Sequence, residues 1–419
     1  MNVLIPTDSF PPACGGSGWS TFELARGLVE RGHKVLVVKV VAGRGGPERA
    51  ADYQDIQVFE YHAYAPALPG VRNYFKNERL YARLADRLEE LIIANRIDLV
   101  HGQHVLSGPP SVMAARRRGI PSVVTVRDYW PVCYRSDTIH TPGTLELCPG
   151  CSRVARVPHG RPRIGVLGLV RTLTQSYLRR NMARKVAVLA SASAVIAVSS
   201  VIGRDLIERA PELAGTRLEV IPNPVNVRGL QRSVGSERPL AEPYALYVGK
   251  LAVNKGTDHL VDVIQQADLD WPLVIVGQGP DRAAIEAAAR AAGRDVRFAG
   301  WLDQAQTATW IAHAGMLIFP SRGPESLSRV LLEASALGVP IAAMNTGGTA
   351  DIVEDEITGL LSDDPPGLAG DVRRIRHGEV LRGRLGAAAA NRIAEKFDSA
   401  SVVARIEALY RDAAREPRL

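Results

Sequence analysis

Short apolar runs and helix-periodic segments alternate along the first part of the chain. Val3-Leu4-Ile5 is a continuous apolar run of the kind that forms a buried strand. After Ser20 and Thr21, apolar residues recur at the three- and four-residue spacing of an amphipathic helix, namely Phe22, Leu24, Ala25, Leu28 and Val29. A second apolar run occupies 35–38. The order strand, helix, strand predicts a βαβ unit and therefore a parallel sheet.

A second series of the same kind begins at residue 244. Apolar runs at 244–248, 273–276 and 316–319 are separated by helix-like segments, so we expect a second doubly wound sheet. The polar stretch 228–243, which contains two glycines and two prolines, is the expected linker. We therefore predict an N-terminal domain at 1–227, a linker at 228–243, a C-terminal domain at 244–398 and a last helix within 399–419.

Composition supports two domains and excludes several classes of protein. A chain of 419 residues with 46% hydrophobic content can bury two ordinary cores. No run of about 18 uncharged apolar residues occurs, so we expect no membrane-spanning helix. The N-terminus lacks the charged and apolar regions of a signal peptide, which indicates a cytoplasmic protein. Four cysteines in this length do not make a disulfide framework, and the net charge of +7 is modest.

Residues 325–333 carry the most informative chemistry. They follow an apolar run and a turn, and precede a Gly-Val-Pro stop, so we expect a strand, a tight loop and a helix. If the helix begins at Glu325, Glu333 lies on nearly the same face, roughly 12 Å along the axis. The first free amides would point outward at the positive end of the helix dipole, which suits a diphosphate. These amides belong to Ser326, Leu327 and Ser328. The alternative is an amphipathic helix with two solvated glutamates.

The same stretch resembles the E-x7-E signature of the family 4 (GT4) retaining glycosyltransferases, in the group 1 family. Residues 347–353 and 358–361 are similar to the rest of that family's C-terminal pattern. The resemblance implies the GT-B fold, an α/β arrangement of two Rossmann-like doubly wound domains facing a cleft, with the last helix crossing back to the first domain. It also implies sugar transfer from a nucleotide-sugar with retention, in which Glu325 orients the sugar and Glu333 binds the ribose.

Two lysines follow the strand at 244–248. The loop Gly249–Gly256 resembles the family's G-R-x4-K-G loop, with Lys250 in place of arginine and Lys255 at the second position. Two cations there would stabilise the negative charge that develops on a diphosphate leaving group. Two surface lysines on a turn are the alternative. Because these cations and the helix dipole supply the positive charge, we expect no metal cofactor. The expected donor is a UDP- or GDP-sugar.

Glycines in the loop 14–18 would let backbone amides approach a phosphate closely. A dinucleotide-binding loop of an oxidoreductase is the alternative. It fits poorly, because Gly16-x-Gly18 is followed by Thr21 rather than by a third glycine, although an NADP site stays open. The family resemblance assigns Gly15 and Gly16 to the donor phosphates or the acceptor.

Two further strands end in polar residues. The run at 98–104 carries His101 and His104, and the carboxyl ends of strands line the crevice of open α/β folds. We therefore expect both histidines to face the sugar or the acceptor, with a metal site as the alternative. The strand 122–126 is followed by Arg127 and Asp128, similar to the family's His-Asp-Tyr strand end with arginine replacing histidine.

Arg127 in that position suggests a charged ligand. An arginine can grip a carboxylate or phosphate bidentately, so we hypothesise a charged group on the donor or acceptor, such as a uronic acid. The alternative is a structural arginine paired with Asp128 or another acid. We place Asp128 with the residues that face the sugar or acceptor.

Three cysteines form a partial metal pattern. Cys148 and Cys151 have the C-x2-C spacing of a zinc knuckle, and Cys133 would be a third ligand. A labile disulfide and plain packing cysteines are the alternatives.

The segment 153–185 contains nine arginines and lysines and no acid. A basic amphipathic segment is typical of binding to an anionic membrane surface or an anionic acceptor, and a solvated basic face is the alternative. No nucleic-acid motif accompanies it, so we expect no nucleic-acid partner. We therefore expect a cytoplasmic protein that binds peripherally to the inner face of the cell membrane through this segment.

These observations predict a hexosyltransferase-type enzyme. It would move a sugar with retention from a nucleotide-sugar to a glycan, a lipid-linked or another membrane-associated acceptor, as in polysaccharide or glycolipid biosynthesis. Two alternatives remain open. One is a nucleotide-sugar epimerase or phosphorylase on the same fold, and the other is a non-catalytic protein that binds a nucleotide-sugar.

Overall fold

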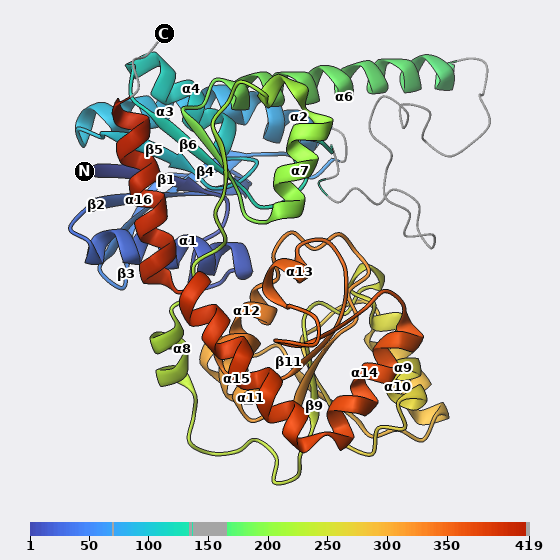
Figure 1. Ribbon diagram of the computed structural model, residues 1–419. Helices are drawn as coiled ribbons and strands as arrows, with labels where there is room; N and C mark the ends of the chain where they lie inside the picture. The colour runs from blue at the N-terminus through green and yellow to red at the C-terminus, as the bar shows by residue number, and fades with distance from the viewer. Residues whose placement is uncertain (69–70, 134–135, 137–165, 416–419) are drawn as a thin grey trace. The chain divides into compact units, whose positions relative to one another are not determined.

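The chain folds into two compact units (Figure 1). The computed structural model describes residues 1–419 except 69–70, 134–135, 137–165 and 416–419, and describes no side chain at 73 or 166–175. Among the described residues, unit 1 contains those up to Pro222 and those from Val402 onward. Unit 2 contains Asn223–Ser401.

An eight-stranded sheet forms the centre of unit 1, in the order β3-β4-β2-β1-β5-β6-β7-β8. The strands are β1 (Asn2–Thr7), β2 (Lys34–Gly43), β3 (Arg49–Tyr53), β4 (Ile56–Tyr64), β5 (Leu99–Gly102), β6 (Ser122–Val126), β7 (Ala194–Ala197) and β8 (Leu218–Val220). Neighbours are parallel except β3, which pairs antiparallel with β4. The parallel sheet expected from the hydrophobic pattern is confirmed.

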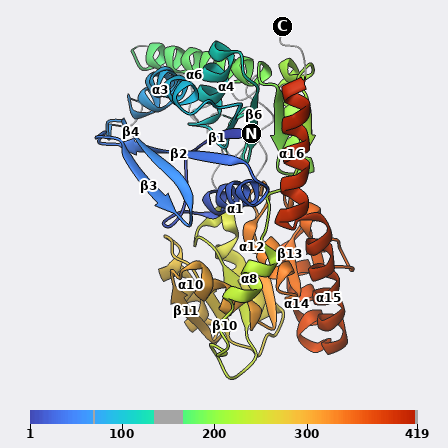
Figure 2. The ribbon, with the colours of Figure 1, turned by 90° about the vertical axis from the view of Figure 1, so that its left-hand side faces the viewer.

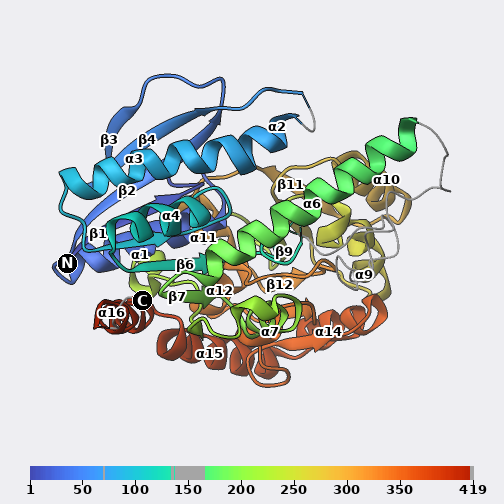
Figure 3. The same ribbon diagram turned by 90° about the horizontal axis from the view of Figure 1, so that it is seen from above.

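Helices cover both faces of this sheet. They are α1 (Gly16–Glu30), α2 (Val71–Tyr74), the π-helix η1 (Phe75–Arg79), α3 (Leu80–Ala94), α4 (Gly108–Arg118), α6 (Val166–Ala190), α7 (Ser200–Arg209), the 3-10 helix η2 (Pro211–Leu213) and α16 (Ser399–Arg415). The apolar sides of α3 and α4 pack on one face, and those of α1 and α16 pack on the other (Figure 2). Helix α6 runs beside α4 (Figure 3).

Helix α1 begins earlier than the apolar periodicity indicates. The pattern predicts a start near Ser20, whereas Gly15 is the N-cap and Gly16 the first helical residue. The amides of Gly18 and Trp19 donate to the Gly15 carbonyl, at 3.0 and 3.3 Å. Glycine and serine thus occupy the first three helical positions, where apolar spacing carries no signal.

The last helix completes the core of unit 1. Val402, Val403, Ile406, Leu409 and Tyr410 are buried in the same cluster as residues of β1, α1, β5, β6 and β7. Glu407 on this helix accepts hydrogen bonds from Arg31 (2.7 Å), His33 (3.2 Å) and Arg411 (2.6 Å). Burial by itself would raise the pKa of Glu407, but the three hydrogen bonds outweigh burial and lower that pKa to about 2.

Replacing Glu407 by glutamine is expected to destabilise unit 1 in a pH-dependent way. At pH 7 the free energy of unfolding should fall by about 2 kcal/mol, because the cations lose their carboxylate. Since the folded pKa, about 2, lies below the ordinary 4.5, the carboxylate's contribution is complete above pH 4.5 and is lost towards pH 2. Urea unfolding at pH 7 and pH 3 measures the difference. Glu30→Gln, whose carboxylate is 63% exposed, is the control. If the free energy of unfolding of Glu407→Gln differed from that of the wild type by the same amount at both pH values, the prediction would be contradicted.

Unit 2 contains a six-stranded, all-parallel sheet in the order β11-β10-β9-β12-β13-β14. Its strands are β9 (Ala245–Val248), β10 (Leu273–Val276), β11 (Val296–Gly300), β12 (Met316–Phe319), β13 (Ile341–Met344) and β14 (Leu360–Ser362). Its helices are α8 (Val227–Ser233), α9 (Leu260–Gln266), α10 (Arg282–Ala291), α11 (Gln304–Ala312), α12 (Arg329–Ala336), α13 (Thr349–Ile352), α14 (Pro365–His377) and α15 (Glu379–Lys396), with the 3-10 helices η3 (Val253–Lys255) and η4 (Thr257–His259).

The first part of the expected linker 228–243 is helical. Helix α8 begins after Asn226, whose side chain accepts a hydrogen bond from the Gly229 amide at 2.9 Å and caps the helix. Leu230 is buried, and the Gln231 amide side chain donates to the Ala336 carbonyl at the end of α12, at 3.4 Å. Composition alone gave no sign of this helix, because it does not register the N-cap or this packing.

Candidate active site

The point where strand order reverses places two predicted residues together in unit 2. The chain fills the sheet from β9 outward to β11, then returns and fills it from β12 to β14, so β9 and β12 are neighbours. In open parallel sheets, ligands bind at the carboxyl ends of such neighbouring strands. Lys255 follows β9 and Glu325 follows β12, and Lys255 Nζ lies 2.5 Å from Glu325 Oε1.

Glu325 is held by contacts from its own loop and from two neighbouring loops. Besides Lys255, the Ser321 hydroxyl donates to the same carboxylate oxygen at 2.5 Å. The Gly348 amide donates to the Glu325 carbonyl at 2.7 Å. Glu325 is 9% exposed, so its carboxylate is oriented by these contacts rather than by solvent. Ser321 is a support that the sequence analysis missed, although its position just after a strand and four residues before Glu325 could have indicated it.

Two glycines allow this close approach of the loops. Gly256 has φ of +69°, and a Cβ atom there would lie 1.8 Å from the Pro320 carbonyl oxygen. Gly347 has φ of +55°, and a Cβ atom there would lie 2.1 Å from the Glu325 carbonyl oxygen. Only glycine fits both the left-handed backbone and the space at these positions.

The predicted start of the following helix is wrong. Helix α12 begins at Arg329, with Ser328 as an extended N-cap, so Glu325 and Glu333 do not share one helix face. Hydrogen bonding of Glu325 to Gly348 and burial of Leu327 hold the preceding residues in a loop. The first-turn amides are therefore those of Arg329, Val330 and Leu331. A role for Ser326, Leu327 and Ser328 in donor binding stays a prediction, without the helical argument for it.

Glu333 and Lys250 differ in their surroundings. Glu333 is one turn into α12, where its Oε1 accepts a hydrogen bond from Arg329 Nε at 2.8 Å. Arg329 is a charged residue that the sequence analysis passed over. Lys250 is exposed at the end of β9, and no described side chain forms an ion pair with it. The backbone carbonyl of Lys250 accepts a hydrogen bond from the Tyr247 hydroxyl at 2.9 Å.

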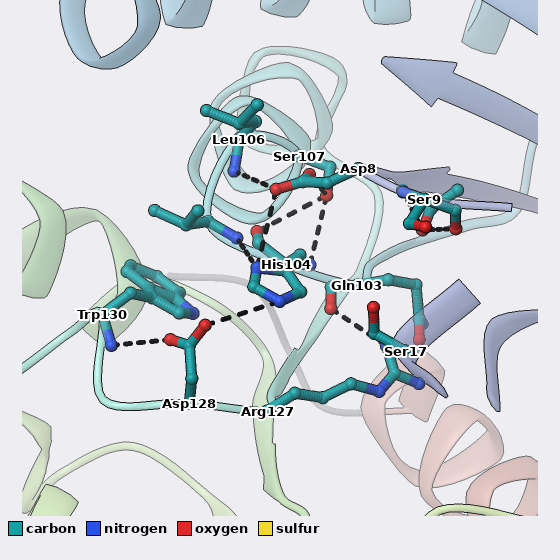
Figure 4. A network of polar contacts seen from close by, with 12 residues as sticks. Asp8, Ser9, Ser17, Gln103, His104, Leu106, Ser107, Arg127, Asp128 and Trp130 are labelled. Carbon is teal, nitrogen blue, oxygen red and sulfur yellow. Dashed lines mark hydrogen bonds and ion pairs between the residues drawn. The ribbon is translucent and has the colours of Figure 1, made fainter. Parts of the chain in front are cut away.

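Unit 1 has a polar network at its own reversal of strand order, where β1 and β5 are neighbours (Figure 4). His104 lies between two carboxylates. Its Nδ1 is 3.5 Å from Asp8 Oδ2, and its Nε2 is 3.4 Å from Asp128 Oδ2. The Leu106 amide and the Ser107 hydroxyl donate to Asp8, at 2.9 and 2.7 Å. His104 and Asp128, both predicted to face the sugar or acceptor, thus lie side by side, and that role stays a prediction. Asp8, which was missed, directly follows the first strand.

Burial shifts the titration of two charged groups beside this network. It raises the pKa of Asp128 above its ordinary value, although His104 and the Trp130 amide act in the opposite direction. It also lowers the pKa of Lys185, on α6, to about 8, although the nearby Asp128 and Glu78 favour the charged form. Burial therefore brings the pKa of each of these two groups closer to neutrality than that of an exposed residue of its type.

His101 does not face a ligand, which corrects the prediction. It is fully buried, and its ring contacts the Tyr410 hydroxyl at 2.6 Å and the Thr125 hydroxyl at 2.7 Å. Burial, reinforced by the charge of Arg127, lowers the pKa of His101 well below its usual value, so the ring is neutral. Strand alternation places His101 on the face of the sheet that α16 covers. Because α16 lies about three hundred residues later, the sequence around His101 does not indicate that this face is buried.

Arg127 has the contacts of a structural arginine. It is 7% exposed, and its Nη1 donates to the Gln103 carbonyl at 3.0 Å (Figure 4). The same nitrogen donates to the Thr21 hydroxyl at 3.4 Å. These contacts tie β6 to β5 and α1. They agree with the structural alternative, with a backbone carbonyl and a hydroxyl among the partners of Arg127. Contact with a charged sugar stays a prediction.

The predicted glycine pair lies at the start of α1. Gly15 is its N-cap and Gly16 its first residue, and both are exposed. No acidic residue occupies the first turn, which leaves the positive end of a 15-residue helix open to an anion. The assignment of Gly15 and Gly16 to a phosphate or the acceptor stays a prediction.

Part of the basic segment belongs to the interior. Lys185 is 4% exposed and lies near Asp128 and Glu78, so it is not part of a basic surface face. Arg179 and Arg180 are exposed, and Arg184 pairs with Glu78. Residues 153–165 lie outside the described part of the chain. Within that part, no helix is both long and apolar enough to span a bilayer.

The zinc prediction rests largely on undescribed residues. Cys148 and Cys151 lie outside the described part, and Cys133 is buried. Among the residues that the structure describes, His, Cys, Asp and Glu side chains form no group of three suited to a metal ion.

Two family models match consecutive parts of the chain. The one described as Glycosyltransferase Family 4 matches residues 14–228, just over half of the chain, and Glycosyl transferases group 1 matches residues 242–377. A D-inositol 3-phosphate glycosyltransferase from Xylanimonas cellulosilytica is 26% identical over 391 residues, covering 90% of this chain and 86% of the relative.

A shorter sequence match and a match to a solved structure agree with these family models. A 2-deoxystreptamine N-acetyl-D-glucosaminyltransferase from Niallia circulans is 32% identical over 143 residues, which span only 32% of this chain and 36% of that protein. The crystal structure of Anabaena HepE in complex with UDP superposes with a TM-score of 0.67 at 18% identity, covering 98% of this chain and 100% of that chain. This last match shows the fold alone. With both family models in sequence on two parallel α/β units, the chain belongs to family 4 of the glycosyltransferases and has their GT-B fold.

Proposed function

We propose that this protein transfers a sugar from a nucleotide-sugar, a UDP- or GDP-sugar, to a hydroxyl of a glycan or lipid-linked acceptor, with retention of anomeric configuration. The observation that carries the proposal is the Lys255–Glu325 contact at the β9–β12 reversal. A structure of similar fold, Anabaena HepE, was solved in complex with UDP, which supports a uridine nucleotide as the donor.

The reaction would break the bond between the anomeric carbon and the diphosphate oxygen. A new bond would form from the acceptor oxygen on the same face, and the acceptor proton would pass to the departing diphosphate. Lys250, Lys255 and the first-turn amides of α12 would stabilise the charge that develops there. Glu325 would accept hydrogen bonds from sugar hydroxyls, and Glu333 from the ribose.

The acceptor is assigned to unit 1. Asp8, His104 and Asp128 offer hydrogen-bond acceptors and a donor at the strand ends, which suits a polyhydroxylated molecule. Exposed Arg179 and Arg180 on α6 support an anionic acceptor or a peripheral position at an anionic membrane surface. This surface is the basis for proposing a role in polysaccharide or glycolipid synthesis.

Binding of nucleotide-sugars tests the donor half of the proposal. We expect one of UDP-, GDP-, ADP- and dTDP-sugars to raise the melting temperature of the wild type, because a ligand that binds only the folded state stabilises it. Glu333→Ala should abolish that shift. Glu354→Ala, which removes an exposed carboxylate paired with Arg392, should not.

Sugar transfer should persist in the presence of EDTA, because lysine side chains of the protein rather than a metal ion stabilise the leaving diphosphate.

Product analysis separates the alternatives. A glycosylated acceptor with the donor's anomeric configuration supports the proposal. An isomerised nucleotide-sugar would indicate an epimerase, and a free sugar phosphate a phosphorylase. Binding without turnover in the presence of candidate acceptors would indicate a binding protein.

A further inference from the structure

Arg329 carries a buried nitrogen without a partner. Its side chain is 10% exposed, and its Nε donates to Glu333 Oε1 at 2.8 Å. Its Nη1 is enclosed and has no hydrogen-bond acceptor in the part of the chain that the structure describes. Buried donors are almost always paired in folded proteins, so an enclosed guanidinium nitrogen points to an acceptor from outside the chain.

The position of Arg329 on its helix also calls for an anion. It is the first residue of α12, an eight-residue helix whose first turn contains no acid. Ser328, the N-cap, makes no capping hydrogen bond through its side chain with any described residue. A cation at the positive end of a helix is unfavourable, and an anion bound there would offset both the dipole and the guanidinium charge.

We propose that Arg329 is a donor-binding residue whose Nη1 donates to a phosphate oxygen of the nucleotide-sugar. The inference rests on the proposed function, which it deepens by adding a guanidinium to the diphosphate site. Arg329 and Glu333 are separated by one helical turn, roughly 6 Å along the axis. Adjoining groups of one nucleotide, its phosphates and its ribose hydroxyls, would then contact the two ends of one ion pair.

Comparing a nucleotide with its nucleoside tests this role. Calorimetry would measure binding of UDP and GDP, and NMR titration that of uridine and guanosine, to the wild type, Arg329→Leu and Arg329→Lys. We expect Arg329→Leu to weaken binding of the preferred diphosphate by about 30-fold, the scale of one charge-assisted hydrogen bond. The affinity for the nucleoside should change less than about twofold. Arg329→Lys should recover part of the lost affinity for the diphosphate. Raised salt should reduce the difference in diphosphate affinity between the wild type and Arg329→Leu.

Arg282→Leu is the matched control. Arg282 also pairs with a glutamate four residues later, Glu286 at 2.8 Å, but both side chains are exposed on α10. This variant should bind diphosphate and nucleoside like the wild type. If Arg329→Leu does not fold, Arg329→Gln removes the charge while retaining hydrogen-bonding capacity.

Two results would overturn the inference alone. One is wild-type diphosphate affinity in folded Arg329→Leu. The other is an equal loss for the diphosphate and the nucleoside, which would mean that Arg329 acts only by holding Glu333. Failure of the wild type to bind any nucleoside diphosphate would overturn the proposed function, and this inference with it.

Discussion

Replacing Lys255 by alanine is expected to lower kcat for sugar transfer by about 100- to 1,000-fold, the loss seen when one preorganised donor to a developing charge is removed. Lys255 Nζ lies 2.5 Å from Glu325 and its side chain is 33% exposed, so it is placed to contact both the carboxylate and a ligand. KM for the donor should change less than kcat, because the charge on the diphosphate grows in the transition state. Steady-state kinetics with the identified donor measures both.

Lys39→Ala is the control for Lys255→Ala. Lys39 forms a comparable ion pair with Glu60 at 3.0 Å, with side chains 21% and 24% exposed, but it lies on β2. We expect this variant to keep wild-type kcat. Circular dichroism should show that both variants are folded, since Glu325 retains the Ser321 hydroxyl as a partner. Activity within tenfold of wild type in Lys255→Ala would contradict the leaving-group role.

The second large effect is expected at Gly256. Alanine there would place Cβ 1.8 Å from the Pro320 carbonyl oxygen, and the φ of +69° is unfavourable for any side chain. The loops after β9 and β12 would have to move apart, which separates Lys255 from Glu325. We expect the free energy of unfolding to fall by about 3 kcal/mol, and activity to fall as in Lys255→Ala. Urea unfolding and kinetics measure the two effects.

Gly293→Ala separates backbone strain from collision. Gly293 has a similar φ of +62°, but no atom lies within 4 Å of an added Cβ. Its loss of stability should be about 1 kcal/mol, with activity unchanged. If Gly256→Ala and Gly293→Ala were equally destabilised, the loops after β9 and β12 would be able to move apart without loss of stability, which would contradict the prediction.

The fold was predictable because its signals are local. Apolar runs alternating with helix-periodic segments indicated parallel sheets in both halves of the chain, and the structure confirms them. Lys255 and Glu325 were predicted as donor ligands from two motifs of one family, in loops 70 residues apart, and the structure places them in contact. Strand order explains the contact, since residues that follow β9 and β12 meet where the order reverses.

The errors arose where tertiary contacts decide. The start of α12 depends on the Glu325 carbonyl binding the Gly348 amide, which no local propensity records. His101 faces Tyr410 rather than a ligand, because a strand pattern gives two faces without saying which one a distant helix covers. Lys185 seemed part of a basic surface, yet its neighbours Glu78 and Asp128 come from other elements.

The dependence of unit 1 on α16 has a consequence for synthesis on the ribosome. Strand β8 ends at Val220, and the helix that supplies Val402 to Tyr410 is translated about 180 residues later. At about 5–20 residues per second, the part of the sheet face in unit 1 that α16 covers stays uncovered for roughly 10–40 s. During that interval α1 covers only part of the face, and the apolar residues that pack against α16 stay exposed to solvent. We therefore expect general chaperones that bind exposed apolar strands to associate with this protein until its last helix emerges.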